Sequence, residues 1–258
     1  MFKNVIVRVP GKSLSEGLSG EGTNEGKPNW TNAIVQHEYY INALTKTGVN
    51  VTVLPPMEDF PDSCFIEDNA LCTPKCVIIS RPGAPTRRNE SQDAQFRETI
   101  KKFYDNIEEI KAPGTIEPGD IMMVGDHYYI GLSARTNEEG AKQMIAILEK
   151  YGMTGETVEM QEMLHLKTGV NYLENNNLLI SGEFLRDPRF DKFNKIEIPE
   201  DEGYAANCIW INGYVIVPAG YPKVKKAIED LGEYKVLEVD TSEFRKVDGG
   251  LSCLSLRF

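Results

Sequence analysis

The feature that most constrains the fold is a repeated rhythm of strand and helix patterns that runs through the chain without a linker. Apolar residues spaced three and four apart predict helices, for example over residues 31–46 and 137–151. Asn212-Gly213 separates two strand patterns and indicates a tight β-hairpin. Strands that alternate with helices are typical of α/β proteins. We therefore predict one compact α/β domain over residues 1–258, although no stretch of sequence repeats strictly.

Length, charge and cysteine content narrow the class of function. The chain has 258 residues and a formal net charge of −11, which argues against binding to nucleic acid or to anionic membranes. No segment approaches the ~20 consecutive apolar residues of a membrane span. The first ten residues alternate like a strand and lack the apolar run of a signal peptide. Together with an odd number of cysteines, five, this predicts a soluble cytoplasmic protein with reduced thiols.

One cysteine and one histidine are candidates for nucleophilic chemistry. Cys253 follows Gly249-Gly250, and two glycines permit close backbone approach by a substrate. A thiol nucleophile needs a partner that shuttles protons, and His165 is the one histidine placed where a strand pattern meets a loop. Taken alone, these residues also fit an ordinary turn, a buried core cysteine and a structural histidine.

Two acidic clusters interrupt apolar strand patterns. Glu67-Asp68 lies within a strand predicted over residues 64–71, and Glu117 and Asp120 stand just before another apolar run. Acidic residues at strand ends are often only turn residues. Alternatively, both clusters line a pocket for a cation. A guanidinium never loses its charge, so a buried site for it must supply paired anions, and carboxylates match its planar donors.

Arginines near two turns indicate a second, anionic subsite. Arg87 follows a Pro/Gly turn, and Arg135 follows Gly131-Leu-Ser-Ala. Both could be solvated, but arginine is also the usual clamp for a carboxylate ligand. Cationic and anionic subsites together suit an amino acid with a guanidino side chain. Cys72 and Cys76 have a spacing seen in metal sites, yet no second Cys or His pair accompanies them, so we expect no metal.

Six motifs, taken in order, resemble the dimethylargininase family of the guanidino-group-modifying superfamily. The resemblance implies the pentein α/β-propeller, with five pseudo-symmetric strand–helix units around a central site. It also implies a hydrolase that converts N-methylated arginine to citrulline through a covalent cysteine intermediate, without a cofactor. The motifs are LPP…FPDSCFIED (54–68), RPGAPTRR (81–88), GLSARTN (131–137), HLKTG (165–169), AANC (205–208) and VDGGLSC (247–253).

The resemblance also implies a role for each matching residue. Cys253 matches the family nucleophile, His165 the proton-transfer residue and Glu117 the acidic residue that completes the catalytic group. The implied substrate contacts are Asp68 and Glu67 at the guanidinium, Asp62 at the polar end, Arg87 and Arg135 at the carboxylate, Leu18 on a flexible flap within residues 13–28, and Val247 near the nucleophile.

One departure from the family pattern concerns the backbone beside Glu117. The family usually has Gly-Gly between this acidic residue and the next Asp, whereas this chain has Pro118-Gly119. Proline fixes its own φ, removes a donor and restricts the residue before it.

Alternative functions remain open on the sequence alone. An arginine deiminase would release ammonia from unmethylated arginine, but that family usually has Asp where this chain has Lys167. Other guanidine-like substrates are also open, and a non-enzymatic binding module, as in the ribosome anti-association factor family, would not need a Cys/His pair. The expected partner is a small guanidino amino acid. The oligomeric state does not follow from the sequence, although a homodimer is one state we consider.

Overall fold

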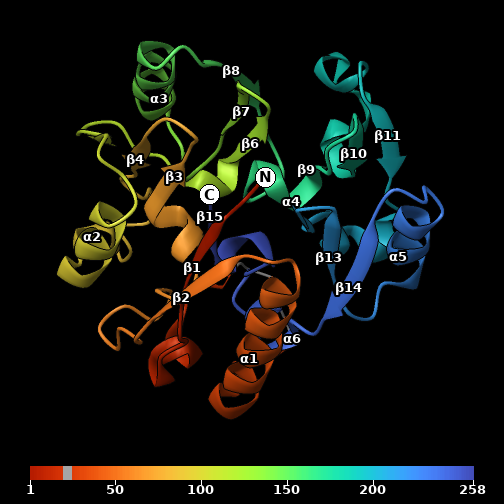
Figure 1. Cartoon of the computed structure of the whole chain (residues 1–258), viewed down its shortest axis with the longest axis horizontal. Coiled ribbons are helices and arrows are strands. Elements are labelled where there is room, and N and C mark those ends of the chain that lie inside the picture. The colour runs from red at the N-terminus through yellow and green to blue at the C-terminus, as the bar shows by residue number, and fades with distance from the viewer. Residues whose placement is uncertain (20–24) are drawn as a thin grey trace. The chain divides into compact units, whose positions relative to one another are not determined.

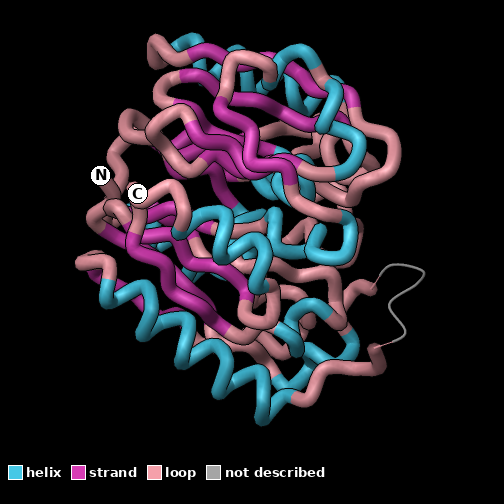
Figure 2. The backbone as a smooth tube through the Cα atoms, turned by 90° about the vertical axis from the view of Figure 1, so that its right-hand side faces the viewer, coloured by secondary structure: helices cyan, strands magenta, loops and turns pink. Residues whose placement is uncertain are grey.

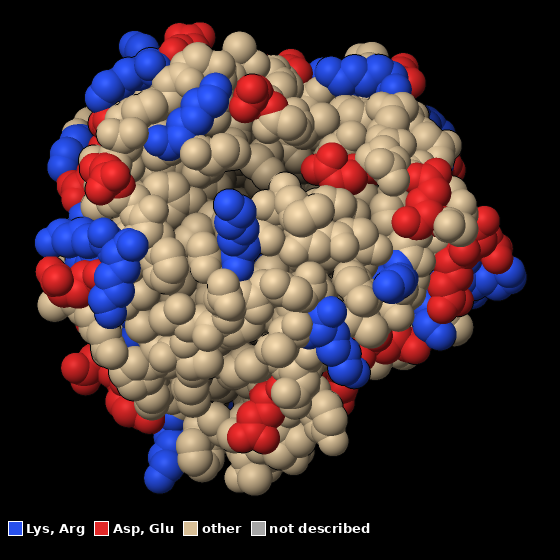
Figure 3. Space-filling view, in the orientation of Figure 1, with Lys and Arg blue, Asp and Glu red and all other residues tan. Residues whose placement is uncertain are grey.

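A computed structural model describes residues 1–19 and 25–258. The chain divides into two compact units, the first formed by Met1–Ile66 with Asn207–Phe258 and the second by Glu67–Ala206. Of the helices in the described ranges, none combines the length and apolar character that crossing a membrane requires. On the face drawn in Figure 3, acidic and basic side chains are interspersed, and no basic patch dominates it.

Five three-stranded sheets repeat one pattern (Figure 1). In each sheet the central strand is antiparallel to one neighbour and parallel to the other. Antiparallel neighbours can be joined by a short turn, whereas parallel neighbours need a longer crossover, which is usually helical. The alternation of strand and helix patterns in the sequence is therefore the signature of one unit used five times.

The first unit holds two of these sheets. β1 (Asn4–Arg8) lies parallel to β2 (Asn50–Leu54), and α1 (Trp30–Lys46) connects them. β1 is antiparallel to β15 (Leu256–Arg257), so the chain ends lie side by side (Figure 2). The remaining elements are β12 (Ile209–Ile211), β13 (Tyr214–Pro218), β14 (Lys235–Val239), α5 (Pro222–Glu229), α6 (Ser242–Arg245), and the 3₁₀ helices η1 (Lys12–Glu16) and η8 (Ser252–Leu254).

The second unit holds the other three sheets, with helical connections before each third strand. Its strands are β3 (Ala70–Cys72), β4 (Val77–Ile79), β5 (Ile107–Glu109), β6 (Ile121–Val124), β7 (His127–Leu132), β8 (Thr154–Glu159), β9 (Val170–Tyr172), β10 (Asn177–Ile180) and β11 (Asn194–Glu197). Its helices are α2 (Ala94–Lys101), α3 (Glu138–Lys150), α4 (Leu166–Gly169), η3 (Glu90–Gln92), η4 (Pro118–Asp120), η5 (Gly182–Arg186), η6 (Pro188–Phe190) and η7 (Glu200–Ala206), and η2 (Ile66–Asn69) begins at the boundary.

Each unit has its own apolar core. In the first unit, α1 buries Leu44 against a cluster that includes Val5 and Phe244. In the second unit, β7 is buried on both faces, because successive side chains of a strand point to opposite sides. Tyr128 packs into one cluster and Tyr129 into another, and both are fully buried. These cores hold the short turns that carry the polar groups described below.

Turn chemistry explains where the strand and helix boundaries fall. The Asn212-Gly213 hairpin is confirmed, with φ of 51° and 83°, the left-handed conformations that such a two-residue turn requires. Helix α3 begins one residue later than predicted, because Asn137 rather than Thr136 is its cap and accepts a hydrogen bond from the Gly140 N–H at 2.8 Å.

Two predicted strands are wrong, and both corrections concern candidate site residues. The segment expected to be a strand over residues 64–71 contains η2, and strand β3 begins only at Ala70. The sequence pattern over residues 249–256 also predicts a strand, but this segment contains η8, which includes Cys253, and only β15 is a strand there. In the first case buried carboxylates take partners from distant segments, and in the second Asn207 binds the backbone of Ser252, so neither segment forms an extended ladder.

Candidate active site

A short helical turn precedes the edge strand that is antiparallel to the central strand in every sheet, and the candidate catalytic residues lie at these turns. Asp68 lies on η2, Glu117 directly before η4, His165 directly before α4, and Cys253 on η8. The fifth such turn is η7, directly before Asn207. The fold thus repeats one location, the entry to a strand pair, and places a different functional group at each copy. Sequence self-similarity could not reveal this regularity, because the turns share a position and not a sequence.

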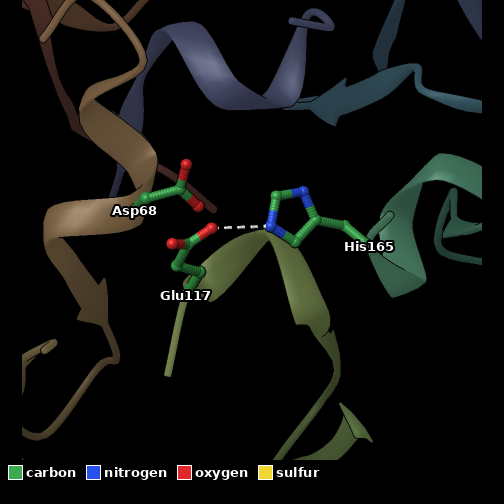
Figure 4. Close-up of side chains that lie close together, drawn as sticks. All are labelled: Asp68, Glu117 and His165. Atoms are coloured by element: carbon green, nitrogen blue, oxygen red, sulfur yellow. Dashed lines mark hydrogen bonds and ion pairs between the residues drawn. The ribbon is translucent and has the colours of Figure 1, made fainter. Parts of the chain in front are cut away.

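Glu117 and His165 form a buried hydrogen-bonded pair (Figure 4). Glu117 Oε2 lies 2.8 Å from His165 Nε2, and the side chains of both residues are buried. Glu117 Oε1 accepts a hydrogen bond from the Ala84 N–H at 3.1 Å and lies 3.6 Å from Nη1 of Arg135. The carboxylate is therefore fixed on both oxygens, with one of them aimed at the imidazole.

The charges around this pair favour an ion pair. Burial alone would raise the pKa of Glu117, but the hydrogen bond and charge of His165, with Arg87 and Arg135, lower the pKa of Glu117 to about 2. Burial alone would lower the pKa of His165, but Asp120, Glu117 and Asp68 together raise the pKa of His165 to about 9. At neutral pH, His165 is therefore an imidazolium that donates to the Glu117 carboxylate.

The shifted pKa of His165 predicts how stability depends on pH. Folding raises the pKa of His165 from 6.5 to about 9, so the stabilisation is complete below pH 6.5 and is lost as the pH rises through about 9. We expect the free energy of unfolding to fall over this range in the wild type. In His165→Gln this part of the fall should be missing. Urea denaturation of both proteins between pH 6 and 9.5 measures it, and parallel curves would contradict the assigned shift.

Pro118 is compatible with this geometry. Glu117 has φ of −117° and ψ of 125°, the extended conformation favoured before proline, and Pro118 is the first residue of η4, where its missing N–H costs nothing. The next residue, Gly119, supplies the N–H that binds Asp68 Oδ1 at 3.1 Å. The departure from the family pattern therefore leaves Glu117 against His165.

Gly119 must be small because His165 lies against it. An added Cβ would lie 3.0 Å from His165 Cγ and 3.2 Å from Asp68 Oδ1. We expect Gly119→Ala to displace the imidazole and so to lower the kcat of a reaction that depends on proton transfer by His165 by about 10-fold. The same substitution should cost about 1 kcal/mol of stability. Gly203→Ala is the control, since open space surrounds that position. Steady-state kinetics and thermal melts measure both, and wild-type kcat in Gly119→Ala would show that the imidazole tolerates displacement.

Arg87 is enclosed by two carboxylates. Its Nη1 lies 2.6 Å from Asp68 Oδ2, and its Nε and Nη2 bind both oxygens of Glu90 at 3.0 and 2.9 Å. Burial would lower the pKa of Arg87, but these carboxylates hold it well above its ordinary value. Arg87 was predicted to clamp a substrate carboxylate, and in this arrangement it instead orients Asp68. Its predicted role remains untested.

Glu67 is paired within the chain, whereas Arg135 is partly exposed. Lys167 Nζ lies 2.6 Å from Glu67 Oε1, and both side chains are buried, so Glu67 is already neutralised within the chain. The Arg135 side chain is 21 % exposed, which leaves it accessible to a ligand, and it reaches Glu117 only at 3.6 Å. Of the two predicted carboxylate clamps, Arg135 is the one with a partly exposed side chain.

In the first unit, three of the predicted substrate contacts gather around one turn. The Leu18 N–H donates to Asp62 Oδ1 at 3.0 Å. A Cβ added to Gly17 would lie 2.9 Å from the same oxygen and 3.2 Å from Val247 Cγ1. Leu18, Asp62 and Val247 are therefore neighbours, and their roles as substrate contacts stay predictions. Of the flap predicted over residues 13–28, residues 20–24 lie outside the described residues.

The turn that carries Cys253 is held by Asn207. Ser252 N donates to Asn207 Oδ1 at 2.8 Å, and Asn207 Nδ2 donates to Ser252 Oγ at 3.0 Å. The two preceding glycines, predicted to admit a substrate, are instead approached by the protein. An added Cβ would lie 2.1 Å from the Phe65 ring at Gly249 and 2.6 Å from Asn207 at Gly250. Cys253 itself is 8 % exposed.

Asp68, Glu117 and His165 also form a set of donors that a metal ion could use. One ligand atom from each lies within 4.8 Å of the others, and the three side chains point toward one another (Figure 4). Two carboxylates and an imidazole suit several divalent cations. However, Arg87 pairs with Asp68 at 2.6 Å and His165 with Glu117 at 2.8 Å, so the local positive charge is already supplied.

Two supporting residues were missed as such by sequence reasoning. Asp120 was grouped with Glu117 as a wall of a cation pocket, but it is fully buried and accepts hydrogen bonds from Ser133, Thr136 and Leu166. Asn207 stood only within a matching motif. The sequence signal that could have identified Asp120 and Asn207 is their position just before a predicted strand, since each lies where the chain enters a sheet.

Fold and site together define an α/β protein of the pentein class with a buried histidine–carboxylate pair and a cysteine on separate turns. The N-terminal domain of a cyanobacterial arginine dihydrolase has the same fold, with a TM-score of 0.86 at 18 % identity and coverage of 98 % of this chain and 97 % of that one. At that identity the likeness shows the fold alone. It confirms the predicted fold class, with five repeated units.

The chain belongs to the dimethylarginine dimethylaminohydrolase family. A family model described as N,N dimethylarginine dimethylhydrolase, eukaryotic, matches residues 20–202. The N(G),N(G)-dimethylarginine dimethylaminohydrolase of Pseudomonas aeruginosa is 58 % identical over the full length of both chains, and that of Streptomyces coelicolor is 33 % identical over 99 % of this chain and 96 % of its own. A structure of the Pseudomonas enzyme, a cysteine-to-serine mutant complexed with citrulline, has a TM-score of 0.97 with full coverage of both chains.

Proposed function

We propose that this chain hydrolyses N-methylated arginine to citrulline and methylamine or dimethylamine, with Cys253 as the nucleophile. The observation that carries the proposal is the 58 % identity, over the whole chain, to an enzyme named for this reaction. A structure of that enzyme is a complex with citrulline, and a dimethylarginine dimethylaminohydrolase structure that is also 58 % identical is an adduct with S-methyl-L-thiocitrulline, which supports a small guanidino ligand and a covalent step. The buried pair of Glu117 and His165 supplies the acid–base group that such a step requires.

The first half of the reaction forms a covalent intermediate. The substrate guanidinium binds near the carboxylates of Glu117 and Asp68, which stabilise its charge. The Cys253 thiolate attacks the guanidinium carbon, forming a carbon–sulfur bond. The carbon–nitrogen bond to the methylated nitrogen breaks as His165 gives that nitrogen its proton, so a neutral amine leaves. His165 is suited to this step because its raised pKa, about 9, keeps it protonated at neutral pH.

The second half restores the thiol. Neutral His165, having lost its proton, takes one from water, and the hydroxide adds to the amidino carbon. The carbon–sulfur bond then breaks and Cys253 leaves as thiolate. The added hydroxyl loses its proton to the departed amine or to solvent, so the carbon retains oxygen as the ureido group of citrulline. Glu117 stabilises the imidazolium that re-forms. Protons and electrons balance without a metal or an organic cofactor.

The remaining predicted contacts divide between the two ends of the amino-acid substrate. Asp62, Leu18 and Val247 gather at one turn, which suits a contact with the polar end. Arg135 has a partly exposed side chain, which leaves its guanidinium as our candidate partner for the substrate carboxylate. For Arg87 and Glu67 we propose that their substrate contacts are indirect, since Arg87 orients Asp68 and Lys167 neutralises Glu67.

The buried ion pair of Lys167 and Glu67 argues against the deiminase alternative. A deiminase of the related family would grip the guanidinium with an acidic group two residues after the histidine, and a cation stands at that position here. We infer that residues 1–258 act as one catalytic domain, which the match over the full length of both chains to the Pseudomonas enzyme supports. We place the reaction in the cytoplasm, since the five cysteines, all in the described ranges, form no disulfide. A homodimer remains a prediction.

Trapping the intermediate tests the proposed function. The protein is mixed with asymmetric dimethylarginine, quenched in acid within the first turnover, and analysed by intact-protein and peptide mass spectrometry. We expect an adduct on Cys253 with the mass of the substrate less that of dimethylamine. An adduct elsewhere, or citrulline formed without any adduct, would contradict covalent catalysis at this cysteine.

A further inference from the structure

Asp120 is a buried carboxylate that takes no part in the steps above. It is fully buried, and three groups donate to it: Ser133 Oγ at 2.7 Å, Thr136 Oγ1 at 2.6 Å and the Leu166 N–H at 3.0 Å. The pKa of Asp120 lies above its ordinary value, because the effect of burial outweighs the charge of His165 and these three donors, which lower it. A site made only of donors is suited to the ionised form.

The two hydroxyl groups connect Asp120 to the backbone of other site residues. Thr136 Oγ1 accepts a hydrogen bond from the Glu117 N–H at 3.1 Å and donates its own O–H to Asp120. Ser133 Oγ accepts the Arg135 N–H at 3.0 Å and likewise donates to Asp120. Because each hydroxyl already accepts an N–H, its O–H is directed to the carboxylate.

The third donor ties Asp120 to the segment of the histidine. Leu166 directly follows His165, so its N–H fixes the backbone from which the imidazole projects. One carboxylate thus binds, directly or through one hydroxyl, the backbone at Glu117, Arg135 and His165. These segments are more than fifteen residues apart along the chain, and each carries a group of the proposed site.

We propose that Asp120 is a positioning residue, which holds the segments of Glu117, Arg135 and His165 in one arrangement and favours the protonated form of His165 by its charge. The inference rests on the proposed function, because it assigns Asp120 to the acid–base group of that reaction. It gives the two carboxylates of the second acidic cluster two roles: Glu117 hydrogen bonds with the imidazole, and Asp120 binds the backbone N–H of the residue that follows His165.

The other charged groups near His165 set the background for a test. Asp68 and Glu117 face it from η2 and the start of η4, and Arg87 and Arg135 offset those charges. Lys167 lies on α4 itself and pairs with Glu67. The elements packed against α4 also carry charged side chains: Glu183 and Arg186 on η5, and Glu200, Asp201 and Glu202 on η7.

Histidine NMR on the full chain tests the role of charge and does not require turnover. The chain has three histidines, so ¹⁵N-labelled imidazoles are resolvable, and His165→Gln assigns the signal. In Asp120→Asn we expect the pKa of His165 to fall by about 1. Glu243→Gln is the control, a buried carboxylate that accepts from Asn29 and Lys246, and it should lower stability and leave the His165 signal unchanged. An unchanged His165 titration in folded Asp120→Asn would overturn the role of the charge.

Kinetics test the positioning. In Asp120→Asn we expect kcat for dimethylarginine to fall at least about 10-fold with little change in KM. We also expect the basic limb of the pH–rate profile to shift to lower pH, in step with the lowered pKa of His165. The double variant Ser133→Ala/Thr136→Val keeps the charge and removes the two ties, so kcat should fall while His165 titrates as in the wild type. It also decides the question if Asp120→Asn does not fold. If the double variant had the same kcat as the wild type, the positioning role would be overturned. If the unmutated chain did not turn over dimethylarginine at all, only the proposed function would be contradicted.

Discussion

Cys253→Ala is expected to lose at least about 10⁴-fold in kcat for dimethylarginine, with the fold intact. The loss is large because the carbon–sulfur bond is the first bond formed, and no other group at its turn can replace the thiolate. Removing one buried sulfur should cost only about 1 kcal/mol of stability. Steady-state release of citrulline and thermal melts measure both quantities.

Cys76→Ala is the matched control for this experiment. Cys76 is fully buried in the core of the second unit and hydrogen bonds with Thr73, and burial raises its pKa, so its thiol is unreactive. Its removal should lower stability by a similar amount and leave kcat unchanged. Residual turnover in Cys253→Ala above about one part in 10³ of wild type would show that attack does not depend on this thiol.

His165→Gln should lower kcat for dimethylarginine by about 10³-fold, because the departing amine then lacks its proton donor. The defect should depend on the leaving group. S-methyl-thiocitrulline releases methanethiol, which departs as thiolate without a proton, so the variant should still form the adduct on Cys253 and then stall before hydrolysis.

The two substrates separate proton transfer from a structural defect. A burst of methanethiol, equal to the enzyme present and followed by slow turnover, would match the proposed role of His165. Loss of the burst together with loss of dimethylarginine turnover would mean that His165 supports the thiolate or the binding site rather than the leaving group. Rapid-mixing detection of free thiol gives both values.

The repeated fold was predictable because strands and hairpins are local. The turn residues Asn212-Gly213 predicted the hairpin of β12 and β13, and the spacing of apolar residues predicted the helices α1 and α3. The failures were the turns at Asp68 and Cys253. Their conformation depends on Arg87 and on Asn207, which are distant in sequence, and local propensity contains no information about such partners.

The candidate site was predictable in its chemistry and less so in its geometry. The resemblance assigned His165 to proton transfer and Glu117 to the same catalytic group. Their side chains lie 2.8 Å apart, and Pro118 is compatible with that contact. What could not be foreseen was which charges pair within the chain. Arg87 and Glu67 each have a buried partner of opposite charge, and Asp120 accepts hydrogen bonds from buried donors. The partners of a buried charge are set by tertiary contacts, which the local sequence does not reveal.

The most direct test of methylarginine hydrolysis is product identification with the purified wild-type chain. Arginine, monomethylarginine and asymmetric dimethylarginine are supplied separately, and citrulline, ammonia, methylamine and dimethylamine are quantified. We expect citrulline and dimethylamine in equal amounts from asymmetric dimethylarginine, citrulline with methylamine from monomethylarginine, and little turnover of arginine. Ammonia from arginine as the fastest reaction, or no citrulline from either methylated substrate, would contradict the proposed function.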